Sequence, residues 1–231
     1  MNWIDHPLSE GSYYHESIPK DSIFIRHTSG YHRPDWVINS WGRDRTESTN
    51  KIRSGSAFVI GGKNEGISKE RKFNGLIYKA FDPHMWAHHL FIKAKNNTFL
   101  NQKSIGIELC NYGELTKTSG GEFYTSTNIK IDAGSVTVLD NSFRGERYFH
   151  SYTDLQIESL YNLLIYLGDR FEINLKKGLS TNIQKIGVSK SFDLSEAAIQ
   201  GSPGVWSHSN VRVDKISCYP HPDLIKAILS L

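Results

Sequence analysis

Residues 104–109 read Ser104-Ile105-Gly106-Ile107-Glu108-Leu109, an apolar run that contains a single carboxylate. Short runs of β-branched and apolar residues are typical of strands that are buried on both faces. A buried carboxylate is unfavourable unless it is paired, hydrogen-bonded or given a raised pKa. Glu108 is therefore either a candidate general base or a side chain that simply points to solvent.

Other short apolar runs predict further strands at 23–25, 57–60, 76–78 and 136–139. Pro34 opens a segment that predicts a helix to about Trp41, because proline is favoured in the first turn of a helix. A longer helix is expected from 153 to about 171, where apolar residues recur every three or four positions and Thr153 with Gln156 can form a capping box. A last helix is expected over 222–231, with surface loops at 61–75 and 113–135. This mixture indicates an α/β or α+β protein with a central sheet.

Length and composition narrow the class of protein. The 231 residues are within the size of one domain and no repeat or linker divides them, so we expect a single domain over 1–231. A formal charge of +3 is far below the dense basic surface that nucleic acid binding requires. The first twenty residues contain no apolar run, so we expect no secretory signal, no membrane span and a chain left in the cytoplasm as synthesised.

His27 is the first candidate for chemistry. It follows the predicted strand at 23–25 and precedes Thr28-Ser29-Gly30, which places it at a strand end that opens into a loop. Such loops carry many binding and catalytic residues. A lone histidine in this position is more often structural, so His27 gains weight only together with other candidates.

The stretch from Trp206 to Cys218 contains a second set of candidates. His208 and Cys218 stand ten residues apart around a polar loop. Neutral imidazole and thiolate are good zinc ligands, and a catalytic zinc has three protein ligands and a water. His27, His208 and Cys218 could supply the three. The same spacing also fits a surface loop with a buried, unreactive cysteine, and by itself it favours that simpler interpretation.

In this order, the stretches resemble the type 2 N-acetylmuramoyl-L-alanine amidase family, which includes amidase-type phage lysozymes and peptidoglycan recognition proteins. The resemblance extends over about residues 20–225, the expected amidase core. Its motifs are the strand ending in His27-Thr28, the element Trp86-Ala87-His88-His89-Leu90, the string 104–109, the helix start at Tyr152-Thr153 with Gln156, and the closing pair His208 and Cys218. Only the string 104–109 is moderately specific alone, but five elements in one order rarely arise by chance.

The resemblance implies a mixed central β-sheet flanked by α-helices, with Zn2+ in an open groove. By this resemblance, His27, His208 and Cys218 bind the zinc. Glu108 then activates the water that cleaves the amide between N-acetylmuramic acid and L-alanine. The expected substrate is peptidoglycan or a muropeptide.

The resemblance also implies roles around the metal. Lys215 would stabilise the oxyanion. His89 would contact the substrate, and Trp86 would either offer a face for sugar stacking or belong to the core. The adjacent His88 leaves the register of this histidine motif open.

Several features depart from the family pattern. The family's lysine stands two residues before the third ligand, whereas Lys215 stands three before Cys218, and Asp214 is an alternative ligand. Two further functions stay open: a peptidoglycan-binding protein of the same fold without catalysis, and a zinc hydrolase of another amide. With no signal expected, the chain would either act on wall fragments in the cytoplasm or reach the wall by phage lysis or specialised secretion.

Overall fold

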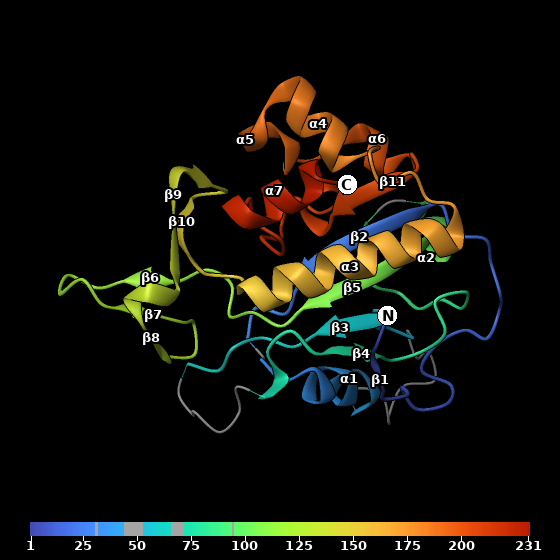
Figure 1. The fold of residues 1–231 in the computed structure, drawn as a ribbon, viewed down its shortest axis with the longest axis horizontal. Helices are drawn as coiled ribbons and strands as arrows, with labels where there is room; N and C mark the ends of the chain where they lie inside the picture. The colour runs from blue at the N-terminus through green and yellow to red at the C-terminus, as the bar shows by residue number, and fades with distance from the viewer. Residues whose placement is uncertain (31, 44–52, 66–71, 94) are drawn as a thin grey trace.

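A computed structural model describes residues 1–30, 32–43, 53–65, 72–93 and 95–231. Its centre is a mixed sheet of six strands in the order β1-β4-β3-β5-β2-β11 (Figure 1). Neighbouring strands are parallel except β3 and β4. The strands are β1 (Ile4–Asp5), β2 (Ser22–His27), β3 (Phe58–Ile60), β4 (Ile77–Lys79), β5 (Ser104–Leu109) and β11 (Gly204–Ser207). The predicted mixed central sheet is confirmed.

Helices flank this sheet, and α3 lies across β2 and β5 with α7 beside it and α4 beside α7 (Figure 1). α3 begins as predicted, because the Thr153 hydroxyl accepts the N–H of Gln156 while the Gln156 side chain accepts the N–H of Thr153. The described part of the chain contains no helix both long and apolar enough to cross a membrane. The helices are α1 (Pro34–Arg43), α2 (Asn97–Lys103), α3 (Asp154–Phe171), α4 (Leu179–Ile186), α5 (Val188–Ser191), α6 (Glu196–Ile199) and α7 (Pro222–Leu229), with 3-10 turns η2 (Ala133–Ser135) and η3 (His208–Asn210).

The two faces of the sheet have separate cores. Successive side chains of a strand point to opposite faces. In β2, Ile23 and Ile25 pack with the leucines of α3 in the main core, whereas Phe24 packs in a smaller core with Leu90 and Trp206. The alternation therefore turns the last residue of β2, His27, toward α3 and the residue before it toward the smaller core.

The segment 113–135 is not the loop that we expected. It forms a small antiparallel sheet of β6 (Thr116–Lys117), β7 (Phe123–Tyr124) and β8 (Lys130–Ile131), which has its own apolar cluster. The sheet and the adjoining hairpin of β9 (Val136–Phe143) and β10 (Glu146–His150) extend to one side of the central sheet, at the left of Figure 1. Strands of two residues are too short to show an alternating pattern, so the sequence did not predict β6, β7 and β8. In the other expected loop, 61–75, residues 66–71 lie outside the described residues.

Candidate functional site

The ends of β2 and β5 bring Arg26 and Glu108 together. The two are register partners, and Arg26 Nε lies 2.9 Å from Glu108 Oε2. Glu108 is only 2% exposed, and the Ser56 hydroxyl donates to the same carboxylate oxygen over 3.4 Å. Burial raises the pKa of Glu108, and the charge of Arg26 acts in the opposite direction. Of the two alternatives that the sequence left open, the structure excludes the one in which Glu108 points to solvent, and the partner of the buried carboxylate is a guanidinium.

His208 lies close to this ion pair. Two consecutive carbonyls hold the two basic side chains: Arg26 Nη1 donates to His89 O over 2.5 Å, and His208 Nε2 is 2.8 Å from Leu90 O. Since Nε2 must donate to that carbonyl, Nδ1 of His208 is the acceptor, and it lies 3.3 Å from Ser217 Oγ. Burial, and after it the charge of Arg26, lowers the pKa of His208 well below its usual value, which favours a neutral ring.

His27 faces the other way, toward α3. Its Nδ1 lies 2.8 Å from the Tyr152 hydroxyl and accepts the backbone N–H of Cys218 over 3.2 Å. Its Nε2 is buried without a hydrogen-bond partner among the described residues, and a Cβ added at Gly113 would lie 3.3 Å from it. Burial lowers the pKa of His27 to about 3 and raises that of the Cys218 thiol. These residues are part of the core beneath α3.

The structure does not bring the three predicted zinc ligands together. His27 and Cys218 are neighbours, but the acceptor nitrogen of His208 is directed at Ser217 instead. Among the described residues, no group of three or more His, Cys, Asp or Glu side chains is arranged to hold a metal ion. Asp214, the alternative ligand, is exposed and lies 2.6 Å from Arg212 in an ion pair. The predicted ligand set does not fit zinc here, and no catalytic step through a metal follows from it.

The predicted substrate contacts are also buried. His89 is 2% exposed, its Nε2 lies 2.9 Å from Ser104 Oγ, and its ring packs so closely on Gly106 that an added Cβ would lie 2.9 Å from it. Trp86 is 5% exposed, and Tyr14 stacks on its ring at 3.9 Å. Both are core residues in this structure, whereas His88 is partly exposed.

Lys215, the predicted oxyanion stabiliser, is exposed on the loop that leads to Ser217. Its backbone carbonyl accepts a hydrogen bond from Arg144, whose guanidinium also donates to Ser209 O over 2.7 Å. The contacts of Arg144 fix the backbone of this loop. Lys215 stands two residues before Ser217, which is the spacing that the resembled family has before its third ligand.

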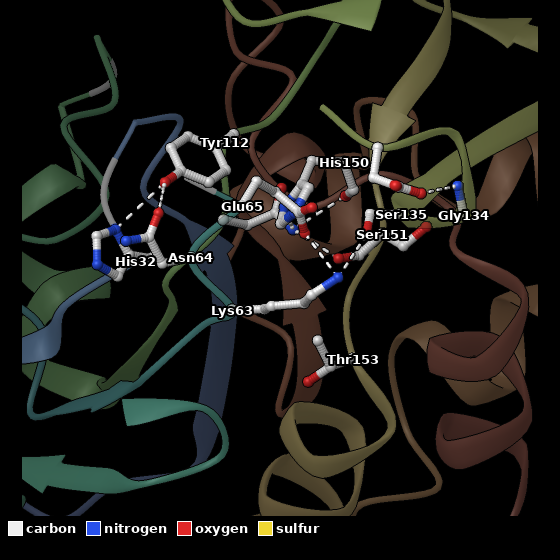
Figure 2. A network of polar contacts seen from close by, with 12 residues as sticks. His32, Lys63, Asn64, Glu65, Tyr112, Gly134, Ser135, His150, Ser151 and Thr153 are labelled. Atoms are coloured by element: carbon white, nitrogen blue, oxygen red, sulfur yellow. Dashed lines mark hydrogen bonds and ion pairs between the residues drawn. The ribbon is translucent and has the colours of Figure 1, made fainter. Parts of the chain in front are cut away.

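A second polar network joins the loop after β3 to the end of β10 (Figure 2). Lys63 Nζ lies 3.1 Å from Glu65 Oε1, and His150 Nε2 lies 3.3 Å from the same oxygen. The side-chain amide of Asn111 donates to His150 Nδ1 over 3.0 Å, so the proton of the neutral ring is on Nε2, which donates to Glu65. Burial acts to raise the pKa of Glu65, but hydrogen bonds outweigh it and lower the pKa to about 2.

This network fastens the loop 61–65 to the β9–β10 hairpin. Both ring nitrogens of His150 are engaged, so the ring is not placed to act as a base. Nearby, the Tyr112 hydroxyl lies 3.2 Å from His32 Nδ1 and 3.3 Å from Asn64 Oδ1 (Figure 2). Sequence reasoning missed the network because Glu65 and His150 stand far apart in the chain and share no motif.

Arg26 and Ser217 were also missed. The alternation of β2 indicated that residues 26 and 27 face opposite sides of the sheet, but the register with β5, which places Arg26 opposite Glu108, is known only from the structure. For Ser217 the signal was its spacing from Lys215.

Neither a family model nor a curated protein sequence matches this chain. Several solved structures are similar to it. N-acetylmuramoyl-L-alanine amidase LysC from Clostridium intestinale URNW is 13% identical, over 100% of this chain and 99% of its own, with a TM-score of 0.48. PlyL is 10% identical over 94% and 86%, with a TM-score of 0.48. PGRP-SA of Apis mellifera is 14% identical over 98% and 94%, with a TM-score of 0.47. Similarity at this level does not extend to the activity.

Proposed function

We propose that this chain binds peptidoglycan or a muropeptide and does not cleave it by a zinc-dependent mechanism. One observation carries the second half of this proposal: Arg26 faces Glu108 and lies near His208, while His27 faces α3. The ligand class is supported by the motif resemblance over about residues 20–225. The competing hypothesis is the zinc amidase predicted from the sequence, which needs a ligand set that the described residues do not form.

The position of Glu108 also argues against hydrolysis. A general base must reach the water from which it takes a proton. Glu108 is buried, paired with Arg26 and hydrogen-bonded by Ser56, so its carboxylate is engaged within the protein. A ligand at this surface would meet the ion pair rather than a free carboxylate.

A partly exposed aromatic surface is formed next to the segment whose carbonyls hold Arg26 and His208. Phe91 is 38% exposed and directly follows the two residues whose carbonyls hold Arg26 and His208. The ring of His88 lies 6.4 Å from that of Phe91 and 6.0 Å from that of Tyr14. Aromatic rings combine an apolar face with polar edges, which suits sugar rings, and the cation of Arg26 suits a peptide carboxylate.

Titration calorimetry with a purified disaccharide-peptide, followed by mass analysis of the ligand with and without added zinc, tests the proposal. We expect saturable binding and a ligand of unchanged mass. Phe91→Ala should weaken binding about tenfold, the equivalent of about 1.4 kcal/mol. The matched control is Val138→Ala, which truncates an apolar side chain that is 52% exposed on β9. Release of free stem peptide that both Glu108→Ala and Cys218→Ser abolish would establish the zinc amidase instead.

A further inference from the structure

We infer that Arg26, His208 and Ser217 form a metal-free counterpart of a three-ligand metal site, in which the guanidinium of Arg26 supplies the positive charge beside Glu108. The inference rests on the proposed function for the class of ligand that the site meets. Beyond that function, we infer that Arg26 and Ser217 are the two residues that keep the site free of metal.

The geometry of His208 is that of a metal ligand. Its Nε2–H donates to the carbonyl of Leu90, and metal-bound histidines commonly orient their rings by such a bond from the second nitrogen. Its Nδ1, the nitrogen that carries the lone pair, lies 3.3 Å from Ser217 Oγ. Two atoms bonded to a tetrahedral zinc at about 2.0–2.2 Å lie about 3.3–3.6 Å apart. His208 and Ser217 are thus spaced as two ligands of one ion would be.

The side chains opposite His208 cannot complete such a site. A serine hydroxyl must lose a proton that it holds far more tightly than a thiol does, because metal ligands of this kind bind in their deprotonated form. Arginine stays protonated in proteins and offers no lone pair. Its charge would also repel a divalent ion. Of the three side chains, only that of His208 is of a kind that binds zinc.

Arg26 supplies the positive charge that a metal ion would supply in a metal site. Its Nε lies 2.9 Å from Glu108 Oε2 and its Nη1 lies 2.5 Å from His89 O, so one guanidinium is held between a carboxylate and a carbonyl. The Arg26 side chain is 20% exposed, whereas the Glu108 side chain is 3% exposed. A fixed charge at this point compensates the buried carboxylate, which would otherwise be strongly unfavourable.

Two substitutions should therefore convert the site into one that binds zinc. After treatment with a chelator, wild type, R26H/S217C and R26K/S217C are titrated with zinc, and the zinc retained per chain is measured after dialysis. We expect R26H/S217C to retain about one zinc and to bind it at least 100-fold more tightly than wild type. The matched control R26K/S217C carries the same new thiol but keeps a cation at position 26, so it should retain none.

Replacing Arg26 leaves Glu108 without its partner, so folding is checked by circular dichroism. If R26H/S217C does not fold, R26H/E108Q/S217C removes the unpaired charge and is titrated instead. A folded variant that binds zinc no more tightly than wild type would overturn the inference. So would a wild-type protein that retains one zinc and loses it in Cys218→Ser. Failure of wild type to bind the disaccharide-peptide would contradict the proposed function. The zinc titrations would still test the inference, because they do not depend on that ligand.

Discussion

Arg26 and Glu108 stand opposite each other at the ends of two adjacent parallel strands, with Nε and Oε2 2.9 Å apart. The ion pair lies on the sheet face that also holds Phe24 and Trp206, away from α3. A carboxylate inside an apolar strand is tolerated here because its neighbour in register carries the opposite charge. This relationship makes the stability of the sheet depend on a pair of polar residues.

Arg26→Met should destabilise the fold by about 3–5 kcal/mol at neutral pH, because removal of one partner leaves a buried charge uncompensated. Denaturant unfolding of wild type and variant measures the difference. Arg26→Met/Glu108→Gln should recover much of the loss, since no charge then remains buried. If the single variant is as stable as wild type, the ion pair has no structural role.

The loss in Arg26→Met should shrink in acid. The folded-state pKa of Glu108 is already raised above its usual 4.5 by burial, and removal of the nearby cation raises it further. A carboxyl with a raised folded pKa opposes folding at pH above its unfolded value and ceases to do so below it. The difference in the free energy of unfolding between wild type and Arg26→Met should therefore be smaller at pH 4 than at pH 7, and unfolding curves at the two pH values measure it.

Glu65→Ala should destabilise the protein by about 1–3 kcal/mol at pH 7, because Lys63 and the Nε2–H of His150 lose their acceptor. The pKa of Glu65 is lowered from 4.5 to about 2, so its contribution is complete above pH 4.5 and is lost as the pH falls toward 2. The gap between wild type and variant should close over that range. Glu122→Ala, which breaks an exposed ion pair with Lys130, is the control, and we expect it to change stability little because solvent screens an exposed pair. Equal effects of the two variants would contradict the role of the network.

Gly106→Ala should cost about 1–3 kcal/mol, because the new methyl group would lie 2.9 Å from the buried ring of His89. Gly120→Ala adds the same group where the nearest atom is 3.8 Å away, and we expect little change in its melting temperature. Thermal unfolding of both variants under one set of conditions gives the comparison. A destabilisation that is no larger for Gly106→Ala would show that His89 moves aside freely.

Both cysteines should resist modification in the folded protein. Cys110 and Cys218 are fully buried, and burial raises the pKa of each thiol. Reaction with a thiol reagent at pH 8 should proceed only after denaturant is added, because the thiolate is the reactive form. Rapid reaction of the native protein at one cysteine would show that the loop around Cys218 opens readily.

Much of the fold followed from local patterns. The runs at 23–25, 57–60, 76–78, 105–109 and 136–139 became β2, β3, β4, β5 and β9, and the helices at Pro34 and Thr153 begin where their first turns predicted. The strand β11, the helix α2 and the short helices α4 to α6 were not predicted. Their segments are short or carry weak periodicity, and tertiary packing stabilises them more than local preference does.

The candidate site was harder to predict, because adjacent residues in a strand point to opposite faces. The sequence places a basic residue and a histidine side by side at 26 and 27, and only the register with β5 decides which one meets Glu108. A motif identifies the end of the strand but not the direction of its last side chain. A histidine at position 26 would face the candidate metal site, whereas the histidine at position 27 faces the core, so a shift of one position along the strand changes the role of the side chain.

The strand β11, from residues 204–207, pairs with β2, from residues 22–27. During synthesis on the ribosome, the backbone of Ile23, Phe24 and Ile25 on that side therefore has no partner until residues 204–207 have been made. Pairing across so long a stretch of sequence slows folding, and an open apolar strand invites pairing between nascent chains. Truncation before residue 204 should yield insoluble material even though most of the sheet remains encoded.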